Sequence, residues 1–303
     1  MDIIPCEVCR EIVEPVLTPD QYYDFYSDKN SFGLLFNKED MPRTLLRCIN
    51  GVYYDEDYVG KSESDIMSYF HDVKDVIVKP TKSNAGQGVM SCRIENNVFL
   101  NSENETYNIN QLSETYRGNF IIQERLTQSD FTAQFNPSSV NTIRMAVYRN
   151  PQTGELHILR AIFRIGGSGA VVDNTHGGGM YTGIDDNGKL CPFVVNNAGE
   201  KKTIHHNIDF EHTEFIIPNF EGIKSFAKRL AQRIPHMHLI AFDLALDKDN
   251  HPRMIEVNTY AFDSFIYQMC LGPTFREYTD EIMDYCWNNR DKLDIDFVRA
   301  YNK

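Results

Sequence analysis

The sequence predicts an α+β protein, and three observations carry this prediction. Strand-type segments follow one another between residues 76 and 165, several of them separated by glycine-bearing turns. An amphipathic helix is expected over residues 221–234, because apolar side chains recur there at helical spacing and Pro235 ends the pattern. Two apolar segments, 239–246 and 254–258, flank a turn-rich linker and predict an antiparallel hairpin.

The elements are expected in the following order. Residues 1–70 form a short, mainly helical N-terminal portion, with helical patterns over 19–25 and 62–70. Strands follow over 76–79, 88–94, 97–100, 120–125, 142–149 and 156–165. The polar segment 204–218 is expected to be a mobile loop, and 274–287 a second helix. We therefore divide the chain into the N-terminal portion, one subdomain over 71–125 and another over 126–303.

The composition argues against several function classes. The chain has 303 residues and a formal net charge of −13, from 30 basic and 43 acidic side chains. Nucleic acids and anionic membranes attract basic surfaces, so neither is an expected partner. No apolar run reaches the length of a membrane span, and the N-terminus lacks a signal-peptide pattern. Seven scattered cysteines favour a reduced, cytoplasmic protein, and Cys6 and Cys9 lack further ligands at zinc spacing.

The hairpin near the end of the chain places two acids opposite each other. If its turn is centred between Asp249 and Asn250, Asp243 pairs with Glu256, because residues paired in an antiparallel ladder keep a constant index sum. Asn258 lies two residues from Glu256 and shares its face. Two opposed carboxylates repel unless a cation joins them, so these oxygen ligands predict a Mg²⁺ site, with exposed hairpin positions as the alternative. The opposite face is expected to be apolar and to contain Ile240, Phe242, Leu244, Ile255 and Val257.

A loop suited to phosphate binding lies far upstream. An apolar strand ends in Lys79, and small residues follow, among them Ser83, Gly86 and Gly88. Glycines let backbone N–H groups approach a phosphate, and the lysine adds a point charge. The pattern is neither a Walker loop nor a Rossmann turn. Alone it could equally be a plain turn, but the acidic hairpin favours the phosphate interpretation.

Together these motifs resemble the ATP-grasp superfamily. The resemblance rests on Lys79 with its loop, on residues 120–126 as a linker strand, and on the acids of the hairpin. The stretches 136–144, 171–179 and 242–258 make the chain similar to the ATP-grasp family associated with sugar transfer and surface-polysaccharide gene clusters. The similarity runs from about Pro42 to about Thr274. It implies an ATP-grasp fold in which two α+β subdomains clamp ATP, with Mg²⁺ or Mn²⁺ as the metal.

The resemblance also implies where the nucleotide lies. The adenine is expected against the linker, beside Gln123, Glu124 and Leu126, and Asp130 is placed to accept from the ribose hydroxyls. Plain surface positions are the alternative for these side chains. Arg144 is expected to bind phosphate or to stabilise the transition state, with a structural ion pair as its alternative.

Further site residues are expected near the glycine-rich stretches. Arg160 and Arg164 share a strand face, and Arg164 is the better candidate to face the triphosphate because it precedes Gly166. Asn174 and His176 precede three glycines and are expected to contact the acceptor substrate, although His176 could equally be a loop histidine.

The implied function is a Mg-ATP-dependent carboxylate–amine ligase that acts through an acyl phosphate in cell-surface polysaccharide biosynthesis. Its acceptors would be small acids and amines, derived from sugars or amino acids. A kinase that makes a stable phospho-product and a non-catalytic ATP-binding partner of a glycosyltransferase are the alternatives. D-alanine ligase-type relatives carry an arginine two residues before the metal aspartate, where this chain has Ala241. That arginine must come from Arg144 or Arg164, or the chemistry differs.

Overall fold

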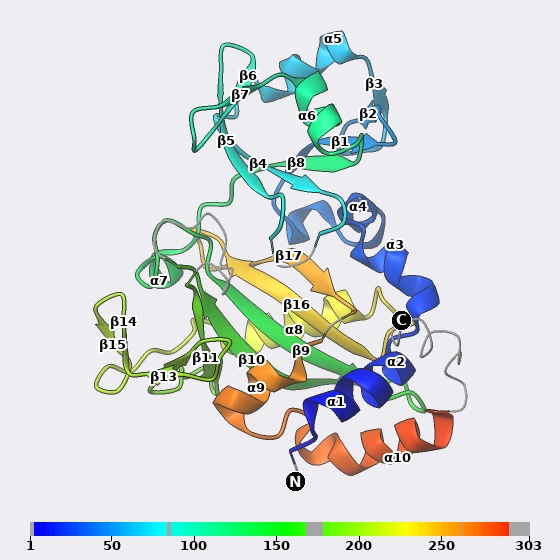
Figure 1. Ribbon diagram of the computed structural model, residues 1–303, viewed down its shortest axis with the longest axis vertical. Coiled ribbons are helices and arrows are strands. Elements are labelled where there is room, and N and C mark those ends of the chain that lie inside the picture. The colour runs from blue at the N-terminus through cyan, green and yellow to red at the C-terminus, as the bar shows by residue number, and fades with distance from the viewer. Residues whose placement is uncertain (1–2, 84–85, 168–177, 261, 291–303) are drawn as a thin grey trace.

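The computed structural model describes residues 3–83, 86–167, 178–260 and 262–290. Its elements build two lobes, each around one antiparallel sheet, with a helical N-terminal segment beside them (Figure 1). The α+β class predicted from the sequence is confirmed.

The upper lobe in Figure 1 contains an eight-stranded sheet. One face of this sheet packs against α5 (Glu63–Ile66), the helical turn η5 (Met67–Phe70) and α6 (Ile109–Thr115). Val76 and Val78 point into this core, so Lys79 lies on the opposite face of the sheet, because neighbouring residues of a strand alternate. In spatial order the strands are β3 (Gly60–Lys61), β2 (Val52–Tyr54), β1 (Thr44–Ile49), β8 (Phe120–Glu124), β4 (Asp75–Pro80), β5 (Met90–Glu95), β6 (Val98–Asn101) and β7 (Thr106–Tyr107).

This sheet begins earlier in the chain than the sequence predicted. Strands β1, β2 and β3 come from residues 44–61, which were expected to belong to a helical N-terminal portion. β1 joins the sheet because it pairs with β8, with Cys48 opposite Phe120, and because Leu46 and Cys48 are buried in the same core. The expected boundary at residue 70 therefore falls inside the upper lobe.

The lower lobe contains a seven-stranded sheet with helices on both faces (Figure 1). Helix α8 (Phe220–Ala231), predicted over 221–234, covers one face through Ile223, Ala227 and Leu230. The other face is covered by α1 (Cys6–Val8), η1 (Cys9–Val13), α2 (Glu14–Leu17), α9 (Ser264–Leu271) and α10 (Thr279–Asn289). In spatial order the strands are β13 (Lys201–Lys202), β12 (Val194–Val195), β11 (Met180–Ile184), β10 (Leu156–Ile165), β9 (Thr142–Arg149), β16 (Leu239–Leu246) and β17 (Pro252–Asn258).

Smaller elements complete the description. The helix predicted over 274–287 corresponds to η7 (Arg276–Tyr278) followed by α10. The segment 204–218, expected to be a mobile loop, contains the short hairpin of β14 (Ile204–His205) and β15 (Ile208–Asp209). Helix α7 (Asp130–Ala133) follows the linker between the lobes. Among the described helices, none is long and apolar enough to cross a bilayer.

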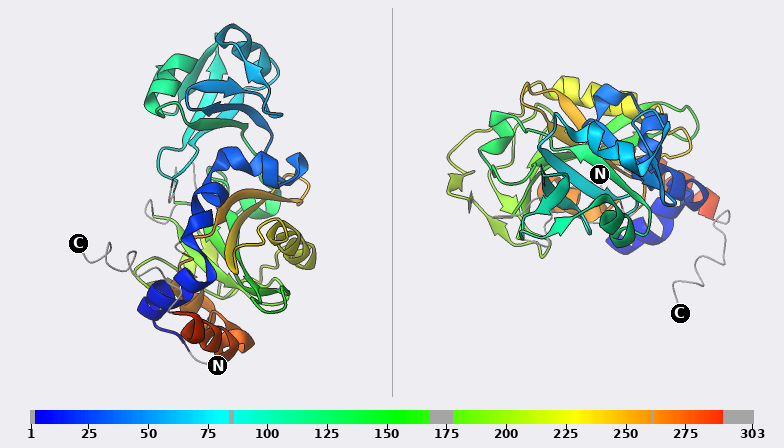
Figure 2. Two further views of the ribbon diagram at one scale, coloured as in Figure 1. Left: turned by 90° about the vertical axis from the view of Figure 1, so that its right-hand side faces the viewer. Right: turned by 90° about the horizontal axis from the view of Figure 1, so that it is seen from above.

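The N-terminal segment runs along one side of the lower lobe and reaches the upper lobe (Figure 2). Its upper part comprises η2 (Asp20–Tyr22), α3 (Tyr23–Ser27), η3 (Lys29–Ser31), α4 (Phe32–Leu35) and η4 (Lys38–Asp40). Asn30 donates from Nδ2 to the carbonyl of Cys48 in the upper sheet at 3.0 Å. Asp40 accepts two bonds, at 2.7 and 2.8 Å, from Arg229 on α8 of the lower lobe. The segment therefore connects the two lobes.

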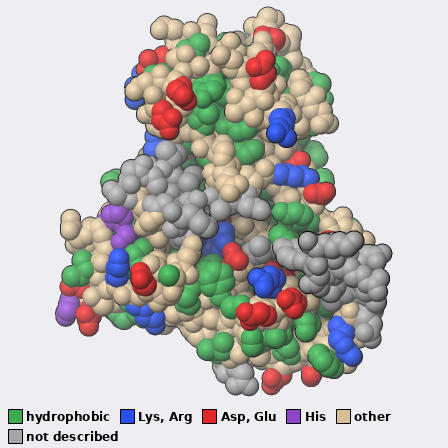
Figure 3. Space-filling model, viewed as in Figure 1, with side chains coloured by type: hydrophobic (Ala, Val, Ile, Leu, Met, Phe, Trp, Pro, Cys, Tyr) green, Lys and Arg blue, Asp and Glu red, His purple; other side chains and the backbone are tan. Residues whose placement is uncertain are grey.

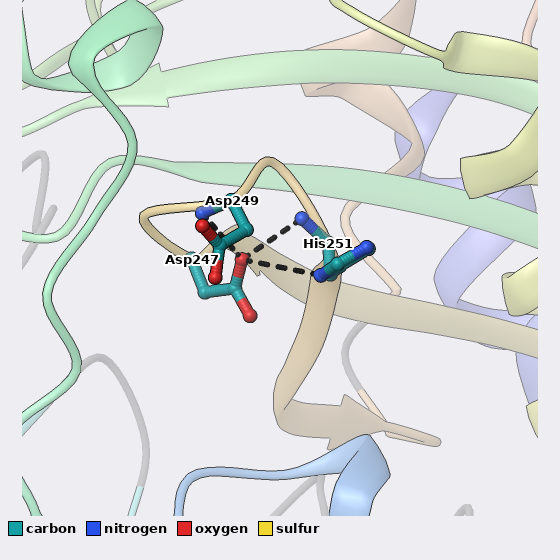
Figure 4. Close-up of side chains that lie close together, drawn as sticks. All are labelled: Asp247, Asp249 and His251. Atoms are coloured by element: carbon teal, nitrogen blue, oxygen red, sulfur yellow. Dashed lines mark hydrogen bonds and ion pairs between the residues drawn. The ribbon is translucent and has the colours of Figure 1, made fainter.

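The turn of the β16–β17 hairpin is stabilised by one carboxylate (Figure 4). Asp247 Oδ1 accepts the backbone N–H groups of Asp249 and His251, at 3.0 and 2.9 Å. Its Oδ2 accepts from Arg253 Nε at 2.9 Å, and Asn250 adopts the left-handed φ of 61° that such a turn needs. Both oxygens of Asp247 thus accept hydrogen bonds that stabilise the turn, so we assign this carboxylate a structural role in the hairpin.

On the face of the molecule shown in Figure 3, acidic and basic side chains are interspersed with hydrophobic ones over both lobes. Among the described residues on this face no broad basic patch is seen, in keeping with the formal net charge of −13.

Candidate functional site

The register predicted for the hairpin is present in the structure. Asp243 on β16 pairs with Glu256 on β17, and Asn258 lies opposite Ala241. A bulge follows Asp243, so Leu244 pairs with Met254 and the ladder shifts by one residue. Phe242, Leu244 and Val257 are buried beneath α8 as expected.

The prediction for Ile255 was wrong. The bulge puts Met254, which is 1% exposed, into the apolar core in its place. Ile255 is left half-buried outside the pairs of the ladder. The prediction assumed a symmetric hairpin without a bulge. A bulge adds one residue to a strand and so reverses the face on which every following residue of that strand lies.

Two arginines from neighbouring strands meet Asp243. Arg144 lies directly opposite Asp243 on β9 and grips its carboxylate with Nε at 2.7 Å from Oδ1 and Nη2 at 2.8 Å from Oδ2. Arg164 from the end of β10 donates from Nη1 to Oδ2 at 3.0 Å. Arg160, its alternative, donates instead to the carbonyl of Pro273 at 3.1 Å. Of the two arginines predicted on this strand face, Arg164 is therefore the one that reaches the acids.

These contacts decide the ionisation of Asp243. Burial alone would raise the pKa of this carboxyl, but the Arg144 and Arg164 guanidiniums outweigh burial and lower its pKa to about 2. Asp263, whose Oδ2 lies 4.0 Å from Arg144 Nη1, has a pKa raised by burial. The phenol oxygen of buried Tyr267 has no hydrogen-bond partner among the described residues. Asp243 is therefore an anion at all ordinary pH values.

Lys79 is buried on the face of the upper sheet that is turned away from its core. Its ammonium donates to Gln123 Oε1 at 3.1 Å. Gln123 in turn donates from Nε2 to the carbonyl of Pro42 and to Thr44 Oγ1, at 3.3 and 3.4 Å. Gln123 thus orients Lys79, and both ends of its amide are engaged within the protein rather than open to a base.

The environment of Lys79 lowers its pKa. Burial, and next the nearby ammonium of Lys29, lower the pKa of Lys79 to about 8, while Glu256 acts in the opposite direction. No carboxylate of the described residues contacts this buried ammonium, so an incoming anion would stabilise it.

The glycines of the loop have the backbone geometry expected of a tight turn. Gly86 and Gly88 have φ angles of 70° and 72°, which L side chains rarely adopt. Tyr116 donates from its hydroxyl to the carbonyl of Gly88 at 2.8 Å, which anchors the end of the loop. Ser83 lies before the gap in the described residues, and its Oγ is 3.5 Å from Lys29 Nζ.

Lys29 is a site residue that sequence reasoning missed. It is 5% exposed, and its ammonium lies 2.8 Å from Glu256 Oε1. It comes from η3 in the N-terminal segment, 227 residues away from Glu256. The available signal was weak: a helix start, where Asp28 accepts from the N–H of Asn30, places the lysine but does not show what it faces.

The linker residues lie at a cavity between the lobes. Glu124 and Leu126 line a space of about 610 Å³, together with Thr44 on β1 and Asp249 in the hairpin turn. Glu124 is exposed, and its backbone N–H donates to the carbonyl of Arg43 at 2.9 Å. Asp130 is exposed at the start of α7, after the linker.

Ala241 is fully buried, and its surroundings explain its small size. It belongs to the core beneath the N-terminal helices and α9, next to Ala146 on β9. An arginine at this position would have to displace that core. Asn174 and His176, expected to contact the acceptor, lie outside the described residues.

The donor set fits Mg²⁺, because carboxylate and carboxamide oxygens are the ligands this ion prefers. The oxygens of Asp243, Glu256 and Asn258 already face cationic groups: Arg144 and Arg164 on Asp243, Lys29 on Glu256, and Arg144 Nη2 at 3.4 Å from Asn258 Oδ1. The charge of the two carboxylates is therefore already balanced by cations of the protein itself.

A protein-family model matches most of the chain. The family model described as sugar-transfer associated ATP-grasp matches residues 14–283. Among curated proteins no match was found. The solved structures that resemble the chain include the ATP-grasp ligase PsnB complexed with precursor peptide PsnA2 and AMPPNP, at 12% identity and a TM-score of 0.48 over 89% of this chain and 62% of PsnB. D-alanyl-alanine synthetase A from Vibrio cholerae matches at 14% identity and a TM-score of 0.44, over 87% of this chain and 64% of its own length.

The chain thus spans about three fifths of the length of these solved structures. It is a protein of the ATP-grasp fold, as the family match over most of its length shows. More narrowly, it belongs to the sugar-transfer associated ATP-grasp family.

Proposed function

We propose that the protein is a Mg-ATP-dependent carboxylate–amine ligase that works through an acyl phosphate. The observation that carries this proposal is the meeting of Lys29 with Glu256 at 2.8 Å and with Ser83 at 3.5 Å. Lys29 thereby connects Ser83, in the candidate phosphate-binding loop of the upper lobe, with Glu256 in the lower lobe. A triphosphate bridged to a metal needs cations and acids at one place, and these residues supply both.

The nucleotide would lie between the lobes. Lys29 and Lys79 would neutralise its phosphates, and positive-φ glycines would let the backbone of the loop approach them. The linker lines a cavity of about 610 Å³, a volume within the usual range for a small-molecule site, and would receive the adenine against Glu124 and Leu126.

Asp243, Glu256 and Asn258 would hold Mg²⁺, whose charge would offset the negative charge of the phosphates during transfer. In the first step a carboxylate oxygen of the acceptor attacks the γ-phosphorus, the bond from that phosphorus to ADP breaks, and an acyl phosphate forms. In the second step an amine attacks the acyl carbon, the bond to phosphate breaks, and an amide, phosphate and a proton result.

Arg144 and Arg164 would supply the arginine that Ala241 cannot provide. Both guanidiniums reach Asp243, so they lie where the transferring phosphoryl group would meet the metal. A planar fork of N–H groups suits phosphoryl and carboxylate oxygens. The acceptors would be sugar acids, amino sugars or amino acids used in a surface polysaccharide; the family description, which names an association with sugar transfer, supports the link to sugars.

The test uses hydroxylamine as a surrogate amine. The full-length protein is incubated with ATP, Mg²⁺ and a pool of sugar acids and amino acids, and the products are read by mass spectrometry. A hydroxamate that forms with ADP and phosphate, and that is absent with Glu256→Gln, supports the ligase. A stable phosphorylated product that hydroxylamine does not trap would replace the ligase by a kinase. No nucleotide turnover with any acid would favour a non-catalytic binding role.

A further inference from the structure

A second carboxylate lies beside Arg144, on the side away from Asp243. Arg144 holds Asp243 with Nε and Nη2, at 2.7 and 2.8 Å. Its remaining nitrogen, Nη1, lies at the other edge of the planar guanidinium, 4.0 Å from Asp263 Oδ2. Asp263 directly precedes α9. It therefore adjoins the proposed reaction centre without being one of the three residues assigned to the metal.

The carboxylate of Asp263 is accessible, unlike that of Asp243. Its side chain is 45% exposed, against 5% for Asp243. Among the described residues no hydrogen bond reaches this carboxylate, and its ion-pair partner is Arg144 at 4.0 Å. Carboxylate oxygens without donors suit a ligand cation that carries N–H groups.

A buried hydroxyl near this carboxylate also lacks a partner. Tyr267 lies about one helical turn after Asp263. Its side chain is 0% exposed, and within the described part of the chain its hydroxyl makes no hydrogen bond. Burial raises the pKa of this phenol, and the charges of Arg144, Asp243 and Asp263 also act on that pKa. The hydroxyl thus keeps its proton and lies among charged groups of the site with its hydrogen-bonding capacity unused.

The two residues are held in place by contacts outside the site. Glu14 Oε2, from α2, accepts the N–H of Phe262 at 3.2 Å. The ring of Phe262 stacks on Tyr267, with the ring centroids 5.4 Å apart. Thr274 donates from Oγ1 to the carbonyl of Ser264 at 2.9 Å. Such support from the surrounding structure is what a substrate-binding group requires.

Resting on the proposed function, we propose that Asp263 and Tyr267 bind the amine acceptor, which enters as a primary ammonium. The ammonium would pair with the Asp263 carboxylate, and the Tyr267 hydroxyl would accept a further N–H. Arg144 would then hold the acyl phosphate while Asp263 holds the nitrogen beside it, and such positioning is a main source of rate acceleration.

The protons of this step are accounted for by groups in the site. The ammonium gives one proton to Asp263, and the resulting amine attacks the acyl carbon. The bond from that carbon to the phosphate oxygen breaks, and the nitrogen releases its second proton to the departing phosphate. The products are the amide and phosphate, with Asp263 protonated until it returns its proton to water.

A purely structural Asp263 would act only as a second counter-ion of Arg144. The two roles affect different steps: loss of a counter-ion would disturb the formation of the acyl phosphate, whereas loss of an amine subsite would affect only its consumption. Hydroxylamine separates them, because it is small and largely uncharged at neutral pH and so does not need a carboxylate partner. The ratio of amide to hydroxamate therefore reports the second step alone.

The experiment incubates the full-length protein at neutral pH with ATP, Mg²⁺, hydroxylamine, a pool of sugar acids and amino acids, and a pool of amino sugars and amino acid amides. Mass spectrometry gives the ratio of amide to hydroxamate for wild type, Asp263→Asn and Tyr267→Phe. Asp280→Asn is the matched control, since Asp280 is an exposed acid in the first turn of α10. Melting temperatures establish that each variant is folded.

We expect Asp263→Asn to lower the ratio at least about tenfold while hydroxamate still forms, the loss typical of a hydrogen bond to a charged group. Tyr267→Phe should lower the ratio by about threefold or more without lowering the melting temperature, because it removes a buried hydroxyl that has no partner. This second variant decides the matter if Asp263→Asn does not fold. The control should leave the ratio unchanged.

An unchanged ratio in both variants would overturn the inference and leave the proposed function intact. Hydroxamate without amide from any amine of the pool would overturn it as well, because a carboxylate subsite should accept at least one small cationic amine. If wild type forms neither amide nor hydroxamate, the proposed function fails, and the amine subsite fails with it.

Discussion

Lys29 Nζ lies 2.8 Å from Glu256 Oε1, although 227 positions separate the two residues in the chain. The contact joins two distant parts of the molecule. The lysine belongs to the N-terminal helical segment that contacts both lobes, and the glutamate belongs to the hairpin at the edge of the lower sheet. It brings a buried cation to the place where the phosphates of a nucleotide would meet a metal.

The first prediction concerns Lys29. Lys29→Met should weaken the binding of Mg·AMPPNP by roughly 10- to 100-fold, because a hydrogen bond to a charged group contributes about 1.5–3 kcal/mol. Isothermal titration calorimetry measures the affinity. Lys82→Met is the matched control, since Lys82 also links the loop to the N-terminal segment, through an exposed pair with Asp24 at 2.8 Å. An equal loss in both variants would show that general charge, not the position of Lys29, matters.

The second prediction concerns the cost in stability of burying the charged Lys79 side chain. Its pKa is about 8 in the folded protein against 10.5 ordinarily, so between these values the unfolded chain holds a proton that the folded chain has released. Stability should therefore rise with pH through this window, and the destabilising effect should be fully present below about pH 8. The difference corresponds to at most roughly 3 kcal/mol.

Denaturant unfolding of wild type and Lys79→Met, at several pH values from neutral to about pH 10.5, measures this effect. We expect the free energy of unfolding of wild type to rise relative to that of the variant as the pH increases. In a separate measurement, Mg·AMPPNP should raise the melting temperature of wild type but not that of the variant. A stability difference that is flat across the window would contradict the burial of a charged Lys79.

The third prediction concerns the metal. Glu256→Gln should reduce nucleotide turnover by at least about 100-fold, because it removes one ligand charge without changing the shape of the side chain. Glu221→Gln is the matched control, because it makes the same substitution at an exposed position of α8, and it should leave turnover nearly unchanged. Phosphate release measures both rates, and near-normal turnover in Glu256→Gln would remove the hairpin from the chemistry.

The fourth prediction concerns Ala241. Ala241→Arg should lower the free energy of unfolding by at least roughly 3 kcal/mol, because it forces a charge into the core beneath the N-terminal helices. Ala198→Arg, at an exposed turn position, is the matched control and should be close to neutral. If Ala241→Arg is as stable as the control, the core described here does not exclude the arginine of D-alanine ligase-type relatives.

Local rules predicted the part of the site that is local in sequence. The pairing of Asp243 with Glu256 follows from a turn of known centre and the constant index sum of a ladder. The amphipathic helix α8 follows from its periodic apolar positions. The bulge after Asp243 was not predictable, because nothing in the residues around it requires one, and it moved Met254 rather than Ile255 into the core.

The features that were missed depend on long-range contacts. Strand β1 holds six residues and includes a buried arginine, so it shows no strand pattern of its own until β8 lies beside it. Lys29 is identified only when Glu256 and Ser83 are seen next to it. The pairing of Arg144 with Asp243 likewise depends on the order of strands in the sheet, which a single sequence does not state.

The central claim is that Asp243, Glu256 and Asn258 hold a metal against the phosphates of a nucleotide. A crystal structure of the protein with Mn²⁺ and AMPPNP, with anomalous diffraction locating the metal, tests this most directly. We predict an anomalous peak at about 2.1 Å from oxygens of these three residues, close to the distance typical of Mg²⁺. We also predict that Lys29 and Lys79 contact the phosphates. Metal bound instead at the hairpin turn of Asp247, Asp249 and His251, or a nucleotide away from Lys79, would contradict the account.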